Sequence, residues 1–257
     1  MLHLCVLGSG SGGNIIYVET ESLKLLIDGG LSARQTLKRL TAIGRRIEDI
    51  DAILVSHEHT DHIQGVGILA RRFMIPVYTN EGTYRQSHLV MGEVPIRRSF
   101  VTGKPFHIHD VLFEPFSLSH DAEDPVGFVI RYGQRKVTIL TDLGYVTHLV
   151  REKARGSHLL VLEFNHDPEM LKACPYPWPI KQRIRSRRGH LSNEEAGRLL
   201  KEVVHQELEY VVLAHLSETS NHPDLALLTA QENISPYTPL LSVAKQHEVG
   251  TLLSLTG

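Results

Sequence analysis

Cysteine is scarce in this chain: two of its 257 residues, Cys5 and Cys174, are cysteines. They leave room for one disulfide bond, but they exclude the disulfide framework of small secreted domains. The sequence also has no apolar run long enough to cross a membrane. Its first residues lack the basic and apolar segments of a signal peptide. We therefore expect a cytoplasmic protein that does not bind membranes.

A large excess of charge of either sign is also missing, because 27 Lys and Arg residues face 29 Asp and Glu residues and give a net charge of −2. This balance predicts neither a basic coat nor an acidic tail, so attraction to an anionic substrate has to come from a local cluster. Histidine, in contrast, is abundant, with 16 residues. With so little cysteine, a transition-metal site in this chain has to use imidazole and carboxylate ligands.

The chain is long enough for one large domain, and its apolar fraction of 42% suffices for a core. Short apolar strands come in a run early, and strands alternate with helices later. We find neither a repeat nor a linker and predict one α/β domain over residues 1–257, with two sheets in a sandwich and helices outside. The expected strands are residues 2–7, 14–19, 23–27, 51–56, 158–162 and 210–214 and parts of 111–140, and the expected helices are residues 32–43, 63–73, 145–154 and 192–204.

The motif HEHTDH at residues 57–62 directly follows one of the expected buried strands. His57 and His59 are two residues apart and can point to one side of an extended loop. Asp61 and His62 come after a turn and can face a second ion. Because unprotonated imidazoles and carboxylates on a rigid loop are metal ligands, the motif predicts a binding site for metal ions.

Four further candidates lie far apart in the sequence, each just after an apolar strand. Since strand ends meet at one edge of a layered sheet protein, these residues can converge on the motif. We expect two ions about 3.5–4 Å apart, bridged by a carboxylate that shares its two oxygens. The expected ligands are His57, His59 and His120 for one ion, Asp61, His62 and His215 for the other, and Asp142 as the bridge, with Asp28 supporting them through hydrogen bonds.

Local patterns leave other roles open for two of these residues. Asp142 could cap a helix, and His215 could be a buried histidine with satisfied hydrogen bonds. The motif favours the ligand role, because four ligands from one loop cannot complete two sites. Two ions would hold a hydroxide between them and polarise a substrate oxygen, so the pattern predicts a hydrolase in which Asp61 is both ligand and catalytic residue.

At these residues the chain resembles the metallo-β-lactamase superfamily, in which an HxHxDH motif is completed by a distant His, a bridging Asp and a late His. The similarity extends over nearly the whole length and points to the YycJ (WalJ) group of bacterial nucleases, described as 5′→3′ exonucleases. It implies a four-layer αββα sandwich with a dinuclear site at one edge, and it implies the ligand assignment given above. The segments that carry it are residues 8–14, 57–62, 119–128, 141–144, 163–167, 189–196 and 215–223.

The segment GHLS at residues 189–192 is similar to an element of ribonuclease Z whose His helps to protonate the leaving group, which implies this role for His190. His190 also precedes an expected helix start, where phosphate binds well. It follows the densest basic run, residues 181–188, which is either a solvated helix face or a contact to the phosphate backbone. Glu163, Asn165 and His166 follow the expected strand at residues 158–162 and could contact substrate. Alternatively, Asn165 and Asp167 could shape a turn and cap the next helix. The candidates for substrate contact are Asn14, Asn165, His166, Arg185 and Arg188.

Together these features predict a metal-dependent phosphodiesterase, in the first place a DNA 5′→3′ exonuclease, that acts through a hydroxide shared by two Zn²⁺ or Mn²⁺ ions. The basic run would position the nucleic-acid backbone without reading bases. Ribonuclease Z-like RNA processing and glyoxalase II-like thioester hydrolysis would use the same site on another substrate. A metal-stabilised regulatory protein without turnover is the alternative outside the enzymes. No protein partner follows from the sequence.

Overall fold

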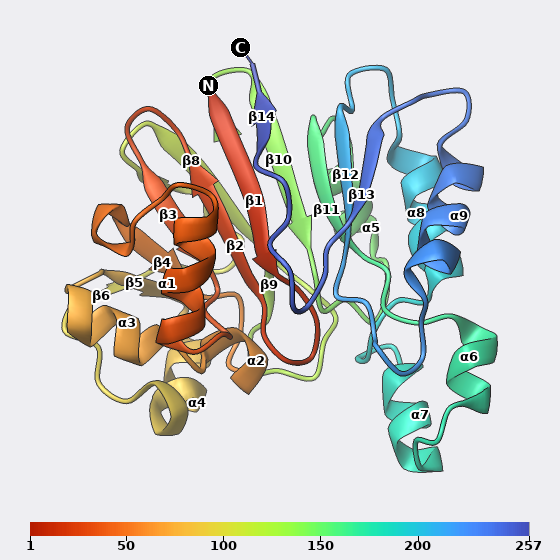
Figure 1. The fold of residues 1–257 in the computed structure, drawn as a ribbon, viewed down its shortest axis with the longest axis horizontal. Coiled ribbons are helices and arrows are strands. Elements are labelled where there is room, and N and C mark those ends of the chain that lie inside the picture. Colours follow the sequence, from red (N-terminus) through yellow and green to blue (C-terminus); the bar gives the residue numbers. More distant parts are fainter. Residues whose placement is uncertain (257) are drawn as a thin grey trace.

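Two seven-stranded sheets lie face to face in the computed structural model, which describes residues 1–256 (Figure 1). In spatial order, the first sheet consists of β14 (Leu253–Leu255), β1 (Leu2–Gly8), β2 (Ile15–Glu19), β3 (Lys24–Ile27), β4 (Ala52–Leu54), β5 (Val77–Thr79) and β6 (Arg97–Ser99). The second consists of β13 (Leu240–Val243), β12 (Tyr210–Ala214), β11 (Leu159–Glu163), β10 (Arg135–Leu140), β9 (Val126–Tyr132), β8 (Val111–Ser117) and β7 (Phe106–Ile108).

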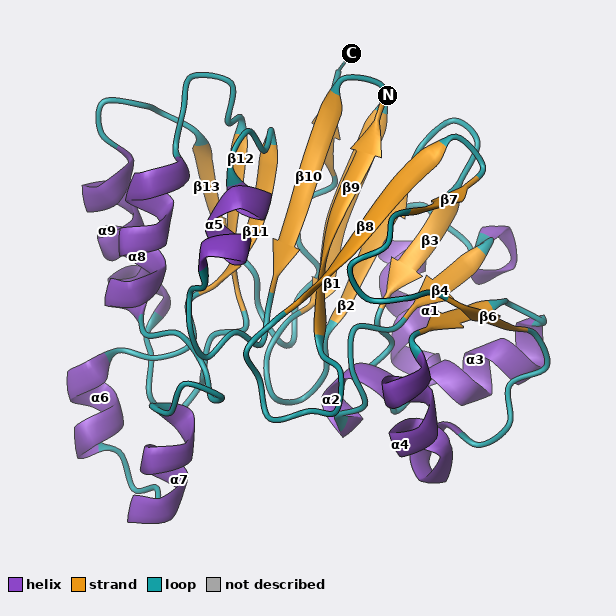
Figure 2. Ribbon diagram, turned by 180° about the vertical axis from the view of Figure 1, so that it is seen from behind, coloured by secondary structure: helices purple, strands orange, loops and turns teal. Residues whose placement is uncertain are grey.

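Helices lie on the outer side of each sheet (Figure 2). The first sheet is accompanied by α1 (Ala33–Ala42), the 3₁₀ turn η1 (Ile47–Asp49), α2 (Thr60–Ile63), α3 (Val66–Phe73) and α4 (Glu81–Met91). The second is accompanied by α5 (His148–Ala154), α8 (Asn193–Val203) and α9 (Pro223–Ile234), while α6 (Pro168–Ala173) and α7 (Trp178–Ile184) project beyond the end of the sandwich. No helix in residues 1–256 is long and apolar enough to cross a membrane.

Three apolar clusters separate these four layers. Because successive side chains of a strand point to opposite faces, Leu25 belongs to the central cluster between the sheets, while Leu26 packs under the helices of the first sheet. In the same way Val161 faces the centre, and Leu160 packs against α5, α8 and α9. This alternation confirms the predicted αββα sandwich.

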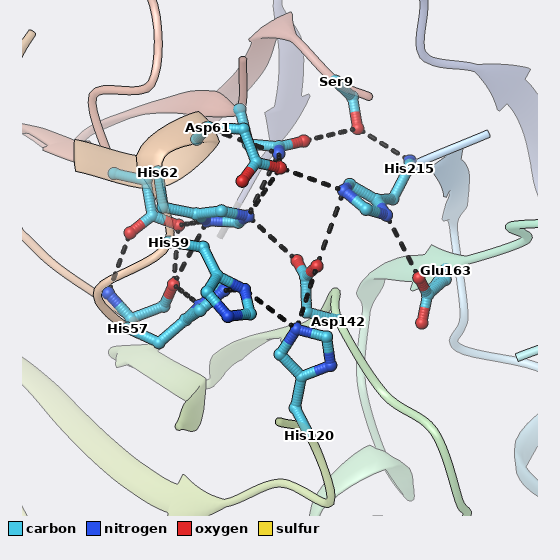
Figure 3. A network of polar contacts seen from close by, with 12 residues as sticks. Ser9, His57, His59, Asp61, His62, His120, Asp142, Glu163 and His215 are labelled. Atoms are coloured by element: carbon cyan, nitrogen blue, oxygen red, sulfur yellow. Dashed lines mark hydrogen bonds and ion pairs between the residues drawn. The ribbon is translucent and has the colours of Figure 1, made fainter. Parts of the chain in front are cut away.

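The strands that carry the site residues run parallel. β3 pairs with β4 in parallel, and β10, β11 and β12 form a parallel row in the other sheet. The carboxyl ends of such strands lie together at one edge of a sheet, and the loops that follow them meet there. The fold thereby brings together residues that are 206 positions apart, such as Ser9 and His215, whose backbone amide donates to Ser9 Oγ (Figure 3).

Several local expectations are confirmed, and one is wrong. Ser32 caps α1 by accepting a hydrogen bond from the Gln35 amide, and a capping box starts α8. The start of the helix expected at residues 63–73 is wrong: α3 covers residues 66–73, and Ile63 belongs to the separate helix α2. The division falls at Gly65, whose amide donates to the Gly29 carbonyl and whose Cα lies too close to the Leu31 carbonyl for any side chain. Both cysteines are free.

Candidate metal centre

Three residues at strand ends have backbone angles in the left-handed region that side chains rarely adopt. The φ values are 61° for Asp28, 60° for Asp142 and 56° for His215. Asp28 and His215 directly follow β3 and β12, and Asp142 comes two residues after β10. Each such conformation costs on the order of 1–3 kcal/mol and persists only where surrounding structure enforces it. The side chains of Asp142 and His215 face the site in Figure 3, and Asp28 Oδ2 contacts His62 Nδ1 at 2.8 Å.

One group of ring nitrogens converges between the motif and the loop after β8. The Nδ1 atom of His59 lies 3.1 Å from His57 Nε2 and 3.2 Å from His120 Nε2. Nitrogens that bind one tetrahedral ion at about 2.1 Å lie about 3.4 Å apart. The predicted set of His57, His59 and His120 therefore has the spacing of three ligands of one ion.

A second group lies beside the first. Asp61 Oδ2 is 3.6 Å from the Nε2 atoms of both His62 and His215. Asp142 stands between the two groups, with Oδ2 3.1 Å from His62 Nε2 and Oδ1 3.5 Å from His215 Nε2 and 3.7 Å from His120 Nε2 (Figure 3). This position suits a carboxylate that bridges two ions.

Two buried atoms at the middle of the site are without a hydrogen bond among the described residues. They are Asp142 Oδ2 and His215 Nε2. The short distance from Asp142 Oδ2 to His62 Nε2 does not have hydrogen-bond geometry. Buried polar atoms left unsatisfied are costly, and a divalent cation between them would remove that cost. The result argues against both open alternatives: His215 is not satisfied by protein partners, and the cap of α5 is Thr147 rather than Asp142.

In four of the expected ligand histidines, one ring nitrogen contacts an oxygen and the other is directed at the site. Such contacts orient metal-binding imidazoles and fix which nitrogen faces the ion. In each case Nδ1 is held and Nε2 points to the site, whereas His59 presents Nδ1. The contacts join His57 to Ser56 Oγ at 2.9 Å, His62 to Asp28 Oδ2 at 2.8 Å, His120 to the Gly189 carbonyl at 3.1 Å, and His215 to Glu163 Oε1 at 3.1 Å.

The electrostatic environment favours the metal-binding protonation state at Asp142, His57 and His120, but not at His62 and His215. Burial lowers the pKa of these two imidazoles, but the charge of Asp142 and of neighbouring carboxylates outweighs it and raises both pKa values well above the usual one, so a metal ion would have to displace a proton there. Burial opposes ionisation of Asp142, but the charges of His215 and His62 outweigh it and hold the pKa of Asp142 well below its usual range. Burial, together with His62, lowers the pKa of His57 well below its usual value, and burial also lowers the pKa of His120. An ionised carboxylate and neutral imidazoles are the forms that coordinate divalent ions.

Glu163, which the sequence placed at this edge only as a possible substrate contact, instead contacts two histidines of the site. It ends β11, is fully buried, and joins two histidines: Oε1 lies 2.7 Å from His190 Nδ1 and 3.1 Å from His215 Nδ1. Its Oε2 accepts hydrogen bonds from the amides of Leu143 and Leu191. The signal in the sequence was a carboxylate at the end of the otherwise apolar strand LLVLE.

Three of the candidates for substrate contact are buried, and two of them contact residues of the metal centre. The Nδ2 atom of Asn14 is 3.1 Å from Asp61 Oδ2 and 3.0 Å from His62 Nε2, and Asn14 is buried. Asn165 donates from Nδ2 to the His215 carbonyl, so it positions a ligand loop. His166 is buried at the same edge. The alternative, that this segment shapes a turn and caps the next helix, is also supported, because the side chain of Asp167 caps α6.

Within the basic run, residues 181–188, some arginines contact other parts of the protein and others are exposed. Arg188 donates from Nε to the carbonyl of His120, and Arg183 forms an ion pair with Asp121 at 2.6 Å. Arg185, at the end of α7, is exposed. His190 stands inside the site, with its ring centroid 5.1 Å from the ring centroids of both His120 and His215.

Comparison with known proteins agrees with this geometry. Residues 24–216 match the family model described as beta-lactamase superfamily domain. The exodeoxyribonuclease YycJ of Bacillus anthracis is 40% identical over 233 residues, which cover 90% of this chain and 88% of that protein. The chain belongs to the metallo-β-lactamase superfamily and, within it, to the YycJ/WalJ group.

The exodeoxyribonuclease WalJ of Streptococcus pneumoniae is 38% identical over 228 residues, covering 87% of this chain and 85% of that protein. The crystal structure of the metallo-β-lactamase fold protein YhfI from Bacillus subtilis covers 99% of this chain with a TM-score of 0.78; at 19% identity this likeness shows the fold. The family confirms the predicted fold and a metal-dependent hydrolase of the nuclease type.

Proposed function

We propose that residues 1–257 form one domain that hydrolyses DNA as an exonuclease with two divalent ions, Zn²⁺ or Mn²⁺. The observation that carries the proposal is the position of Asp142, a buried carboxylate with an unsatisfied oxygen between two groups of ligand atoms. The names of the relatives, exodeoxyribonucleases, support DNA as the substrate. The 5′→3′ direction rests on the similarity to their group.

The two groups of side chains match the ligand preferences of such ions. His57, His59 and His120 would hold an ion through three nitrogens, which suits zinc. Asp61, His62 and His215 would hold the other with an added carboxylate, which manganese also accepts. When bound, the two ions would supply Lewis acidity and lower the pKa of water to about 7.

His190 is placed to give a proton to the leaving oxygen. Glu163 is a carboxylate and only accepts, so the 2.7 Å contact orients His190 with a proton on Nδ1 toward Oε1. The proton for the leaving oxygen is then a second one, carried on Nε2 of the imidazolium form, and its release returns the ring to the neutral form with the proton on Nδ1. The Nε2 atom, which takes part in no hydrogen bond within residues 1–256, is left to face the substrate. The ring is partly exposed at the border of the buried ligands, where a phosphodiester can reach it.

Digestion of end-labelled oligonucleotides tests the proposal. Single- and double-stranded DNA and RNA are incubated with the protein and Mn²⁺ or Zn²⁺, beside a lactoylglutathione-type thioester. We expect mononucleotides released progressively from the 5′ end of DNA. Turnover of the thioester or of RNA without DNA hydrolysis would contradict the proposal, and so would a protein that binds metal but turns over none of these substrates.

Variants connect the activity to the site. Asp142→Ala and His59→Ala are each expected to lower the rate by at least about 1,000-fold, because each removes a ligand from the centre. His107→Ala is the matched control, since His107 is an exposed histidine of β7 outside the cluster. Activity that survives both ligand replacements would refute a mechanism based on these ions.

A further inference from the structure

Helix α7 presents an unusual face to solvent. None of its residues is buried, and Trp178, the only tryptophan of the chain, is 63% exposed. Trp178, Lys181, Gln182 and Arg185 follow the spacing i, i+3, i+4 and i+7, which places them on one side of a helix. Together they line a shallow hollow in the surface, which we call the α7 face. It combines one large aromatic ring with two cations and contains no acidic side chain.

The opposite side of this segment is fastened to a ligand loop of the metal centre. Arg183 pairs with Asp121, the residue after the ligand His120, and Arg188 donates to the carbonyl of His120. Ser119 donates from Oγ to the carbonyl of Arg187 at 2.6 Å. These contacts hold α7 against the loop that supplies His120.

The distance along α7 between Trp178 and the ion pair of Arg183 follows from helix geometry. Trp178 is five residues from Arg183, which is about 7.5 Å at 1.5 Å per residue, a distance on the order of two stacked nucleotides. Both ribbon views place α7 at the same end of the sandwich as α2, which carries Asp61 and His62 (Figures 1 and 2). Helix α7 therefore lies at the end of the sandwich that carries the metal centre, and its α7 face is the side turned away from the His120 loop.

We propose that the α7 face is a platform for single-stranded DNA, on which a base stacks against Trp178 while Lys181 and Arg185 contact the adjoining phosphates. The inference rests on the proposed nuclease function and specifies its substrate as an unpaired strand next to the scissile bond. A largely exposed indole beside cations is the combination with which proteins hold single strands without regard to sequence. In a duplex the bases are already stacked on each other and are not available to the ring.

The single tryptophan supplies a direct readout. A phosphorothioate-linked DNA 12-mer that resists hydrolysis is titrated into the metal-loaded protein, and the fluorescence of Trp178 is recorded. We expect strong quenching by the single strand and little by the same sequence as a blunt duplex. Fluorescence that a saturating single strand leaves unchanged would overturn the proposal, as would a tryptophan already shielded in a dimer of the free chain.

Variants separate stacking from charge. Trp178→Ala is expected to raise the Kd of a fluorescently labelled single strand by about 5- to 100-fold in anisotropy titrations, the loss of one stacked base. Trp178→Phe keeps a ring and is expected to recover part of the affinity. Leu89→Ala is the control, because Leu89 is a 94% exposed apolar side chain on α4. The Kd of this variant for the single strand is expected to match that of the unmodified protein.

An abasic 12-mer with the same phosphates is the matched control ligand. It is expected to bind the unmodified protein and Trp178→Ala equally, because only the base contact is lost. If Trp178→Ala lost as much affinity for the abasic strand as for the complete strand, base stacking would be overturned. Quenching by polyglutamate that equals quenching by DNA would also overturn it and would point to an acidic protein partner. DNA hydrolysis without quenching would refute the platform alone, whereas quenching without hydrolysis would refute the nuclease function alone.

Discussion

Replacing Glu163 by Gln is expected to impair the metal centre with little change of volume. Oε1 of Glu163 faces the Nδ1 atoms of His190 and His215, and Oε2 accepts from the amides of Leu143 and Leu191. Glutamine has one oxygen and one NH₂ group in these two places. Because the backbone amides cannot stop donating, the oxygen has to stay with them, and the NH₂ group turns toward the two imidazoles.

The consequence follows from the tautomer of His215. Facing a donor, its Nδ1 has to accept, so the ring proton moves to Nε2, the atom that lies 3.5 Å from Asp142 Oδ1 and 3.6 Å from Asp61 Oδ2. A protonated Nε2 cannot bind metal. Loss of such a supporting contact costs about 10- to 100-fold in metal affinity or activity, and we expect Glu163→Gln to lower both by this amount.

The assay compares metal titrations by calorimetry with the rate of DNA hydrolysis at saturating DNA. Glu202→Gln serves as control, because Glu202 forms only a half-exposed ion pair with Arg151 on the surface and is expected to leave both quantities unchanged. If Glu163→Gln bound metal and cleaved DNA like the unmodified protein, the tautomer reasoning would be refuted.

Three further predictions concern stability. Removing the metal ions with EDTA is expected to lower the melting temperature by about 10 °C, because an ion present at 1,000 times its Kd stabilises by about 4 kcal/mol, and returning Zn²⁺ restores it; an unchanged melting temperature would mean that no ion is held. Gly30→Ala is expected to cost about 3 kcal/mol or more in urea unfolding, since the added carbon would lie 1.6 Å from the Asp61 carbonyl oxygen; an unshifted midpoint would contradict this packing. Burial lowers the pKa of His166 to about 4 in the folded protein. Between about pH 6.5 and 4 the unfolded chain, in which the pKa is about 6.5, takes up a proton that the folded chain does not. The contribution of His166 to stability is therefore complete above about pH 6.5 and is lost as the pH falls from about 6.5 to 4. Between pH 7.5 and 5 we expect a loss of about 2 kcal/mol that is missing in His166→Gln, and equal losses in both proteins would contradict it.

The convergence of the expected ligands could be predicted from the sequence because their signals are local. The motif at residues 57–62 follows directly on a buried strand, and Asp142 and His215 also follow strands. Strand ends in a parallel sheet share one edge, so the order of the elements was enough to expect convergence.

What remained hidden depends on contacts between distant segments. Glu163 acquires its role because β11 lies between β10 and β12, which places its carboxylate between His190 and His215. The division of the helix at Gly65 follows from the close approach of the Leu31 carbonyl. Helix α7 lacks the apolar periodicity that reveals a packed helix, because it is held by the pairing of Arg183 with Asp121.

Anomalous diffraction from crystals of the metal-loaded protein tests the proposed dinuclear centre most directly. We predict two peaks per chain about 3.5–4 Å apart, with a carboxylate oxygen of Asp142 on each. One peak is expected among His57, His59 and His120, and the other among Asp61, His62 and His215. A single peak, or two peaks that Asp142 does not join, would contradict a dinuclear centre in this protein.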